Sequence, residues 1–190
     1  MCDKPLDFND YEKVGVLGVK LVIGRFFEEG LIKFVQMELN NSERGGDYLV
    51  GTGQVPSKNE NDKQCDLIVV EKRIDKYYHC KIGNIIIPYQ PDIIRLVVEV
   101  KTGIGKTEAR SAINDYKNLV ENGCPLLIFG IFESKKETIE NWKKDFKKEK
   151  EIGEKVMDHV HLIPYKWEIS TPNAKWEEEL RYLLKKCLKI

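Results

Sequence analysis

The sequence predicts a single α/β domain in which a mixed central sheet is flanked by helices. Two segments of strand length, 64–71 and 93–101, are apolar on both faces or nearly so, as expected for strands of a covered sheet. A helical pattern over 106–122 separates the second of them from another apolar run, 126–132, so these two strands should be parallel neighbours joined by a crossover helix. We expect one domain over residues 1–190.

Composition is typical of a globular protein with one core. Hydrophobic residues make up 42% of the 190 residues, charged residues 33%, and the formal net charge is zero. Nucleic-acid-binding proteins are often basic overall, so any such contact here must come from a local basic patch. The five cysteines are scattered without a Cys-x-x-Cys pair, which indicates neither a disulfide framework nor a zinc ribbon.

The location expected from these features is cytoplasmic. The chain opens on Met1-Cys2-Asp3-Lys4 and continues into polar sequence, which is unlike a signal peptide. No apolar run reaches the length that spans a membrane, so a membrane partner is not expected.

The first predicted element is a helix over about 11–40. Phe27, Leu31 and Phe34 follow helical spacing and form its apolar stripe. Glycine weakens a helix, so the segment forms either one helix or two pieces with a break near Gly24.

A hairpin follows the loop that ends this helix. Residues 48–55 form the first predicted strand, in which Gly51 and Gly53 indicate a bulge or the close approach of another backbone. The polar segment 56–63 then turns the chain into the strand 64–71.

The helix over 106–122 presents one apolar stripe toward the sheet and stops at Gly123. Its inward residues are Ala109, Ala112, Ile113, Tyr116 and Val120. The other elements predicted after the hairpin are a short strand at 85–87, a loop at 102–105, a helix at 138–150, a strand at 160–163 and a helix at 173–189.

The strand 93–101 is the centre of the predicted sheet. Alternation places Ile94, Leu96, Val98 and Val100 on one face, and Ile93, Arg95, Val97, Glu99 and Lys101 on the other. Charged groups at the end of a buried strand are costly unless they are paired or bind a metal. The strand could also simply run out into solvent at this point.

A second acid strengthens the hypothesis that these charged residues form a functional site. If strands 64–71 and 93–101 pair antiparallel, Asp66 lies next to Glu99 and Lys101. Two carboxylates held close together repel each other and need a cation, and Mg²⁺ prefers oxygen ligands of this kind. The lysine could then act on a water molecule or on the charge of a phosphate.

These residues resemble the motif of the PD-(D/E)XK, or restriction-endonuclease-like, nuclease superfamily. The matching residues are Asp66 and the triplet Glu99-Val100-Lys101, although Cys65 replaces the proline of the motif. Three short segments are similar in sequence to an uncharacterised prokaryotic subgroup of this superfamily, and the similarity extends over roughly 25–132. The segments are Thr52-Gly53, Lys63 to Val69 and Val98 to Thr102. The resemblance implies an αβββαβ core, Mg²⁺ or Mn²⁺ as cofactor, and the Val100 carbonyl as a further metal ligand. The settings that it implies are restriction, phage defence or repair.

The function expected from this resemblance is a metal-dependent nuclease, most readily a DNA endonuclease, in which Asp66 and Glu99 bind the ion and Lys101 assists hydrolysis. The expected partner is nucleic acid, and a homodimer is one possible assembly. The alternative is a catalytically inactive nuclease-like domain that binds nucleic acid or a protein. If Asp66 and Glu99 lay far apart, only an α/β structural protein would remain.

Further candidates are weaker. Gln64 lies two residues before Asp66 and could position a phosphate or water. The superfamily often adds a helical glutamate near the metal, and of Glu28 and Glu29 we take Glu29 as the candidate. His159 and His161 share a strand face, a spacing that can bind metal but also fits ordinary histidines.

A lysine-rich stretch in the helix over 138–150 has two interpretations. Its lysines interleave with acids, which is typical of a solvated face with ion pairs but could also contact phosphates. Trp142 and Phe146 should pack inward rather than stack on bases. The lysines are Lys143, Lys144, Lys147, Lys148 and Lys150.

Overall fold

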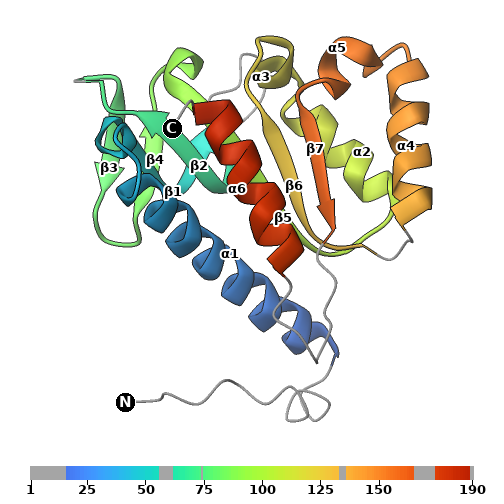
Figure 1. Ribbon diagram of the computed structural model, residues 1–190, viewed down its shortest axis with the longest axis horizontal. Coiled ribbons are helices and arrows are strands. Elements are labelled where there is room, and N and C mark those ends of the chain that lie inside the picture. Colours follow the sequence, from blue (N-terminus) through green and yellow to red (C-terminus); the bar gives the residue numbers. More distant parts are fainter. Residues whose placement is uncertain (1–15, 56–61, 74, 133–135, 165–173, 189–190) are drawn as a thin grey trace.

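The computed structural model describes residues 16–55, 62–73, 75–132, 136–164 and 174–188. Within these ranges seven strands form one mixed sheet in the order β3-β4-β1-β2-β5-β6-β7 (Figure 1). The strands are β1 Tyr48–Val55, β2 Lys63–Glu71, β3 Tyr77–Cys80, β4 Ile85–Pro88, β5 Ile94–Ile104, β6 Leu126–Phe132 and β7 Val160–Pro164.

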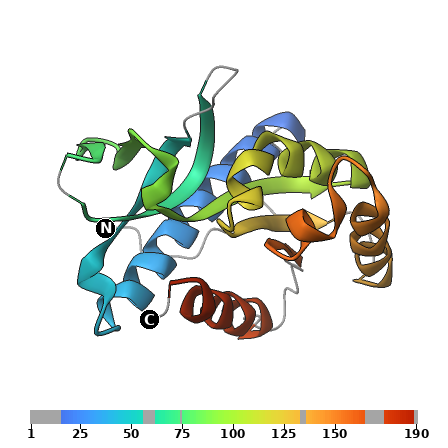
Figure 2. The ribbon, with the colours of Figure 1, turned by 90° about the horizontal axis from the view of Figure 1, so that it is seen from above.

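Helices cover both faces of this sheet. Helices α1 and α6 lie on one face, and α2 to α5 lie on the other; Figure 2 shows α6 and α2 on opposite sides of the strands. None of the described helices is long and apolar enough to cross a membrane. The helices are α1 Val16–Asn40, α2 Lys106–Asp115, α3 Lys117–Glu121, α4 Lys136–Lys148, α5 Gly153–Met157 and α6 Ala174–Leu188.

Strand β5 is the interior strand that its apolar pattern predicts. Leu96, Val98 and Val100 pack in a buried cluster with α1 and α6, and Val97 packs in a second cluster with α2 to α5. Burial on both faces makes β5 the element against which both helical layers are packed.

The pairing confirms the predicted topology. Strand β2 lies antiparallel between β1 and β5, whereas β6 is parallel to β5 and β7 is parallel to β6. The helix, three strands, helix and strand of the predicted αβββαβ core are therefore α1, β1, β2, β5, α2 with α3, and β6.

The glycines of β1 behave as predicted. The register between β1 and β2 shifts between Gly51 and Gly53. A Cβ atom at Gly51 would lie 2.2 Å from the Asn84 carbonyl oxygen, and one at Gly53 would lie 2.6 Å from that of Ile86. Glycine at both positions therefore lets the backbone before and within β4 approach β1.

The predicted alternation of the central strand is wrong at its beginning. Val69 pairs with Leu96 but Val70 pairs with Ile94, so β5 carries one extra residue, Arg95. Ile94 consequently packs with Val97 on the face of α2, not with Leu96. A bulge of this kind reverses the alternation locally.

The structure shows how two of the predicted helices are divided. Helix α1 runs without a break through Gly24, because one glycine costs only about 1 kcal/mol relative to alanine and tertiary packing overrides it. The predicted residues 11–15 of this helix lie outside the described part of the chain. The helix predicted over 106–122 is divided at Tyr116, which ends α2 and begins α3.

The loop predicted at 102–105 is mostly strand. Strand β5 continues to Ile104, with an extra residue at Gly103 between the pairs formed by Thr102 and Ile104. Gly103 has a φ of +80°, a left-handed conformation that glycine adopts without strain. Strand β3 and helix α5 were not predicted, because each is short and lacks a clear period.

The lysine-rich stretch lies in and just beyond α4 and has the ion pairs of a solvated face. Lys143 bonds Glu140 at 2.9 Å and Lys147 bonds Asp158 at 3.0 Å. Trp142 and Phe146 are buried, as predicted.

Gly130 in β6 generates a test of how tightly the sheet is packed beside Lys101. A Cβ atom at Gly130 would lie 1.8 Å from the Lys101 carbonyl oxygen, so Gly130→Ala must push β6 away from β5. We expect a loss of about 1–3 kcal/mol in the free energy of unfolding, measured by urea denaturation. The control Gly46→Ala meets no atom within 4 Å and should change stability far less. Equal effects of the two substitutions would contradict the close approach.

Candidate active site

Asp66 is positioned by a bulge in β2. Cys65 pairs with Gly53 of β1, and Ile68 pairs with Gly51. One residue of β1 therefore lies opposite two residues of β2, Asp66 and Leu67, so β2 carries one extra residue there. Bulges redirect side chains, and here the Asp66 Oδ2 atom accepts a hydrogen bond of 2.6 Å from the Val100 backbone N–H. The Asp66 side chain thereby connects β2 to β5 within the triplet Glu99-Val100-Lys101.

Glu99 and Lys101 share one face of β5, as the alternation predicts. The Lys101 Nζ atom forms an ion pair with Glu99 Oε1. The Glu99 side chain is only 12% exposed, whereas that of Lys101 is 40% exposed. The Lys101 ammonium can therefore reach solvent, whereas the Glu99 carboxylate is largely buried.

Tyr116 holds the other oxygen of Glu99. Its hydroxyl lies 2.9 Å from Glu99 Oε2 and 2.9 Å from the Gln64 carbonyl oxygen, so it links β2, β5 and the junction of α2 with α3. Burial, and then the Glu99 charge, raise the pKa of Tyr116, so the hydroxyl remains a proton donor. The sequence placed Tyr116 on the buried helix stripe but gave no sign that it reaches Glu99.

The Glu99 charge makes Asp66 harder to ionise, as a neighbouring carboxylate should. Burial, and after it the Glu99 charge, raise the pKa of Asp66 to about 7, while the Val100 N–H and Lys101 oppose the shift. The pKa of the nearby Cys65 thiol is raised by burial and by the same two acids. The potential at the site is therefore negative, which favours a cation.

The remaining candidates are placed differently. The Gln64 side chain is exposed, and the contact that it makes with the site runs through its backbone carbonyl. Glu29 is exposed, whereas Glu28 is half-buried and its charge raises the pKa of Asp66. Of the two glutamates, Glu28 is thus the one that faces the acids. His159 and His161 line a cavity elsewhere.

The donor set fits a small hard cation. Among the described residues, no group of three or more His, Cys, Asp and Glu side chains is arranged to hold a metal ion. Mg²⁺ needs no such cage, because it is usually bound through one or two carboxylates together with waters and substrate phosphates. The carboxylates of Asp66 and Glu99 would serve as its protein ligands.

The class of fold is defined by this topology: the chain is a mixed α/β domain with an αβββαβ core, and helices cover both faces of its sheet. Structures of NucC are among the solved structures that resemble it. The apo form from E. coli MS115-1 has 12% sequence identity and a TM-score of 0.47, over 86% of this chain and 92% of that chain. Its cAAA-bound form has 12% identity and a TM-score of 0.48, over 85% and 89%.

The cAAA-bound form of NucC from P. aeruginosa ATCC27853 is also similar, with 13% identity and a TM-score of 0.35 over 59% of this chain and 65% of that chain. No protein-family model matches the chain, and no curated protein matches it.

The raised pKa of Asp66 generates a pH test. A carboxyl whose pKa is about 7 in the folded state, against an ordinary value of 3.8, holds its proton longer when folded, so it destabilises the fold progressively as pH rises from about 4 to 7. Asp66→Asn should therefore equal wild type near pH 4 and be more stable at pH 8, by on the order of 1 kcal/mol once solvent screening is allowed for.

Thermal melts across this pH range, without divalent ions, measure the difference. The control Glu178→Gln changes an exposed carboxylate on α6 and should show no such trend. A stability difference for Asp66→Asn that is the same at pH 4 and pH 8 would contradict the raised pKa.

Proposed function

We propose that this chain is a metal-dependent phosphodiesterase acting on nucleic acid, most readily a DNA endonuclease. The observation that carries the proposal is the convergence of Asp66, Glu99 and Lys101 at one place on two adjacent strands. Two carboxylates supply ligands for a hard cation, and the neighbouring ammonium supplies a positive charge for a phosphate. The resemblance of this motif to PD-(D/E)XK nucleases supports the same reaction.

A bound Mg²⁺ or Mn²⁺ would supply Lewis-acid stabilisation of the phosphate and lower the pKa of a water molecule. Asp66 and Glu99 would hold the ion, with the Val100 carbonyl as a further oxygen. The Val100 N–H fixes one oxygen of Asp66 and leaves the other oxygen available. Tyr116 orients Glu99 through one oxygen, and the ion would have to take the place of Lys101 at the other oxygen.

Lys101 has a different role from the two acids. Its ammonium is close enough to pair with Glu99, yet the side chain is 40% exposed and can reach a phosphate in solvent. An ammonium at this position stabilises the negative charge that develops on phosphate oxygens, or orients the attacking water. Lys63, which pairs with Asp115 at 3.2 Å, adds a second cation on the strand of Asp66.

The second candidate function is a nuclease-like domain that binds nucleic acid or a protein without cutting it. The observation in its favour is the Lys101–Glu99 ion pair, because an ammonium that stays on the carboxylate would occupy a ligand position. Cys65 in place of the motif proline and the net charge of zero are also consistent with it.

Cleavage assays separate these functions. With Mg²⁺ or Mn²⁺, wild type should cut plasmid or single-stranded DNA, and Lys101→Ala should lose roughly a hundredfold in rate, the usual loss for one stabilising donor. Lys101→Ala should still bind the ion in calorimetry, whereas Glu99→Gln should lose both cleavage and binding because it deletes a ligand charge. The control Lys155→Ala, an exposed lysine on α5, should cut like wild type.

Thermal melts must accompany these assays, because removing one member of a close charge pair can destabilise the fold. A folded Lys101→Ala that cuts at the wild-type rate would overturn the proposed role of the lysine. If wild type cuts neither DNA nor RNA with either ion, the binding function replaces the enzyme.

A further inference from the structure

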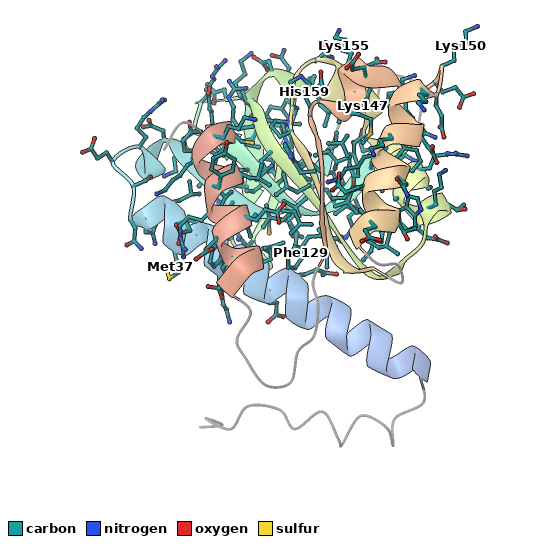
Figure 3. All side chains as sticks on the ribbon, turned by 45° about the vertical axis from the view of Figure 1, so that its right-hand side comes forward. Met37, Phe129, Lys147, Lys150, Lys155 and His159 are labelled. Carbon is teal, nitrogen blue, oxygen red and sulfur yellow. The ribbon has the colours of Figure 1, made fainter. Side chains whose placement is uncertain are left out.

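A cavity of about 590 Å³ lies at the opposite end of the sheet from Asp66 and Glu99. It is lined by the start of β5, the turn between α3 and β6, the start of β7 and the last turns of α6. Figure 3 shows the separation: His159 lines the cavity at one end, and Phe129, whose backbone pairs with Val100, lies toward the other. The volume lies within the range of about 300–1,000 Å³ that is common for small-molecule sites.

The polar groups of this cavity are mainly donors. Arg95, Lys186, His159 and His161 line it together with two acids. The two acids are already paired with cations: Asp92 with Arg73 at 3.3 Å, and Asp158 with Lys147 at 3.0 Å. Lys186 has no acidic partner within the described part of the chain.

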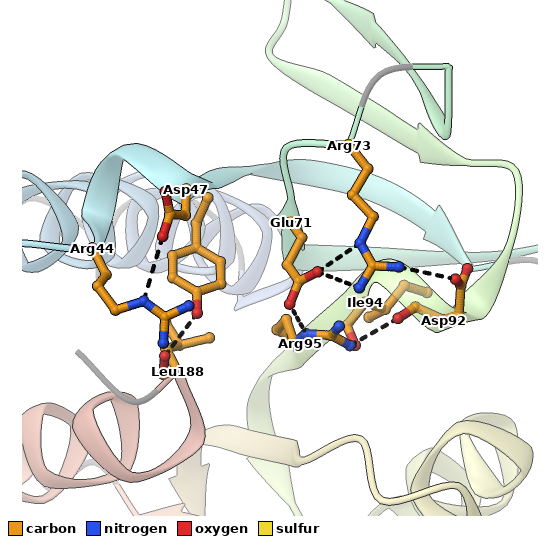
Figure 4. A network of polar contacts seen from close by, with 9 residues as sticks. Arg44, Asp47, Glu71, Arg73, Asp92, Ile94, Arg95 and Leu188 are labelled. Carbon is orange, nitrogen blue, oxygen red and sulfur yellow. Dashed lines mark hydrogen bonds and ion pairs between the residues drawn. The ribbon is translucent and has the colours of Figure 1, made fainter.

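Arg95 is held with part of its guanidinium still available. Figure 4 shows its Nε atom bonded to Glu71 and its Nη1 atom bonded to the Asp92 carbonyl, at 2.6 and 2.8 Å. Over the ranges that the structure describes, Nη2 forms no hydrogen bond. The guanidinium is thus oriented in advance without being fully satisfied.

The groups around His161 include several cations. Burial lowers its pKa to about 4, and the charges of Lys186, Lys143 and His159 act in the same direction. No acid in the described ranges is placed to reverse this, and His161 has no side-chain hydrogen bond there. A half-buried imidazole beside an unpaired ammonium is costly to leave without an acceptor.

We propose that this cavity binds a small organic phosphate monoester. Arg95, Lys186 and His161 would donate to the phosphate oxygens, and the side chains of Ile94, Leu119 and Pro125 would line the organic part. A phosphate presents three oxygens to donors that come from β5, β7 and α6, whereas a carboxylate presents two. The site is separate from the Asp66–Glu99 pair and does not depend on the proposed nuclease activity.

A metal is the competing occupant, since Cys124 and Cys187 also line the cavity. Burial raises the pKa of Cys124 to about 12 and also raises that of Cys187, so both thiols stay protonated and are poor ligands. The part of the chain that the structure describes holds no cluster of metal-binding side chains. The anion is therefore favoured.

Calorimetric titration of the full chain in EDTA tests the site, with phenyl phosphate as the probe. Phenyl phosphate should bind more tightly than inorganic phosphate, which lacks the apolar part, and more tightly than benzoate, which lacks the third oxygen. Lys186→Gln should weaken binding by roughly tenfold or more, as expected for losing a charged hydrogen bond. The control Lys155→Gln removes an equal charge from exposed α5 and should leave binding unchanged.

A second variant keeps the proposal testable if Lys186→Gln does not fold. His161→Gln keeps one donor and a similar size, and should weaken binding while its melting temperature stays near that of wild type. Three results would each overturn the proposal: no saturable binding of phenyl phosphate, equal weakening by Lys155→Gln, or binding unchanged in folded Lys186→Gln and His161→Gln. Benzoate binding as tightly as phenyl phosphate would also reject the phosphate assignment.

Discussion

The hydrogen bond from the Val100 N–H to the Asp66 carboxylate is the contact on which the candidate site depends. It joins two strands at a point where β2 carries an extra residue, and without that bulge Asp66 would follow the ordinary alternation of its strand. The contact needs β5 to be fixed, and β5 is fixed because both its faces are buried under helices. The geometry of the two acids therefore depends on how the core of the domain packs.

Holding the acids together has an electrostatic cost that the surrounding groups only partly offset. Lys101 and Tyr116 both contact Glu99, whereas Asp66 receives a single backbone donor and keeps a raised pKa. Groups with strongly shifted pKa values gather at functional sites, although structural networks can shift them as well. In the proposed function this asymmetry is useful, because the acid that is least satisfied gains most when a cation binds.

Much of this architecture could be predicted from the sequence. The apolar runs of β2, β5 and β6 and the crossover helix fix the order of the core, and the antiparallel pairing of β2 with β5 brings Asp66 to Glu99. These features follow from periodicity and connection rules, which act over short stretches.

What could not be predicted depends on single extra residues and on contacts distant in sequence. The bulge at Arg95 moved Ile94 to the other face, and Gly103 kept β5 in the sheet where a loop was expected. Tyr116, which lies where the helix is divided, contacts Glu99 on another element, and the choice between Glu28 and Glu29 required the orientation of α1 on the sheet. Strand β3 pairs with β4 and is too short to show a period.

In the proposed function, Asp66 and Glu99 form one cation site in which the ion competes with a proton. Calorimetric titration with Mg²⁺ at pH 6 and pH 8, in buffers of different ionisation enthalpy, measures both affinity and protons released. Because ligand carboxylates must be deprotonated and the pKa of Asp66 is raised to about 7, binding should be tighter at pH 8, with a proton released at pH 6. Affinity that does not change between these pH values, or that is higher at pH 6, would contradict a shared site for the ion and the proton.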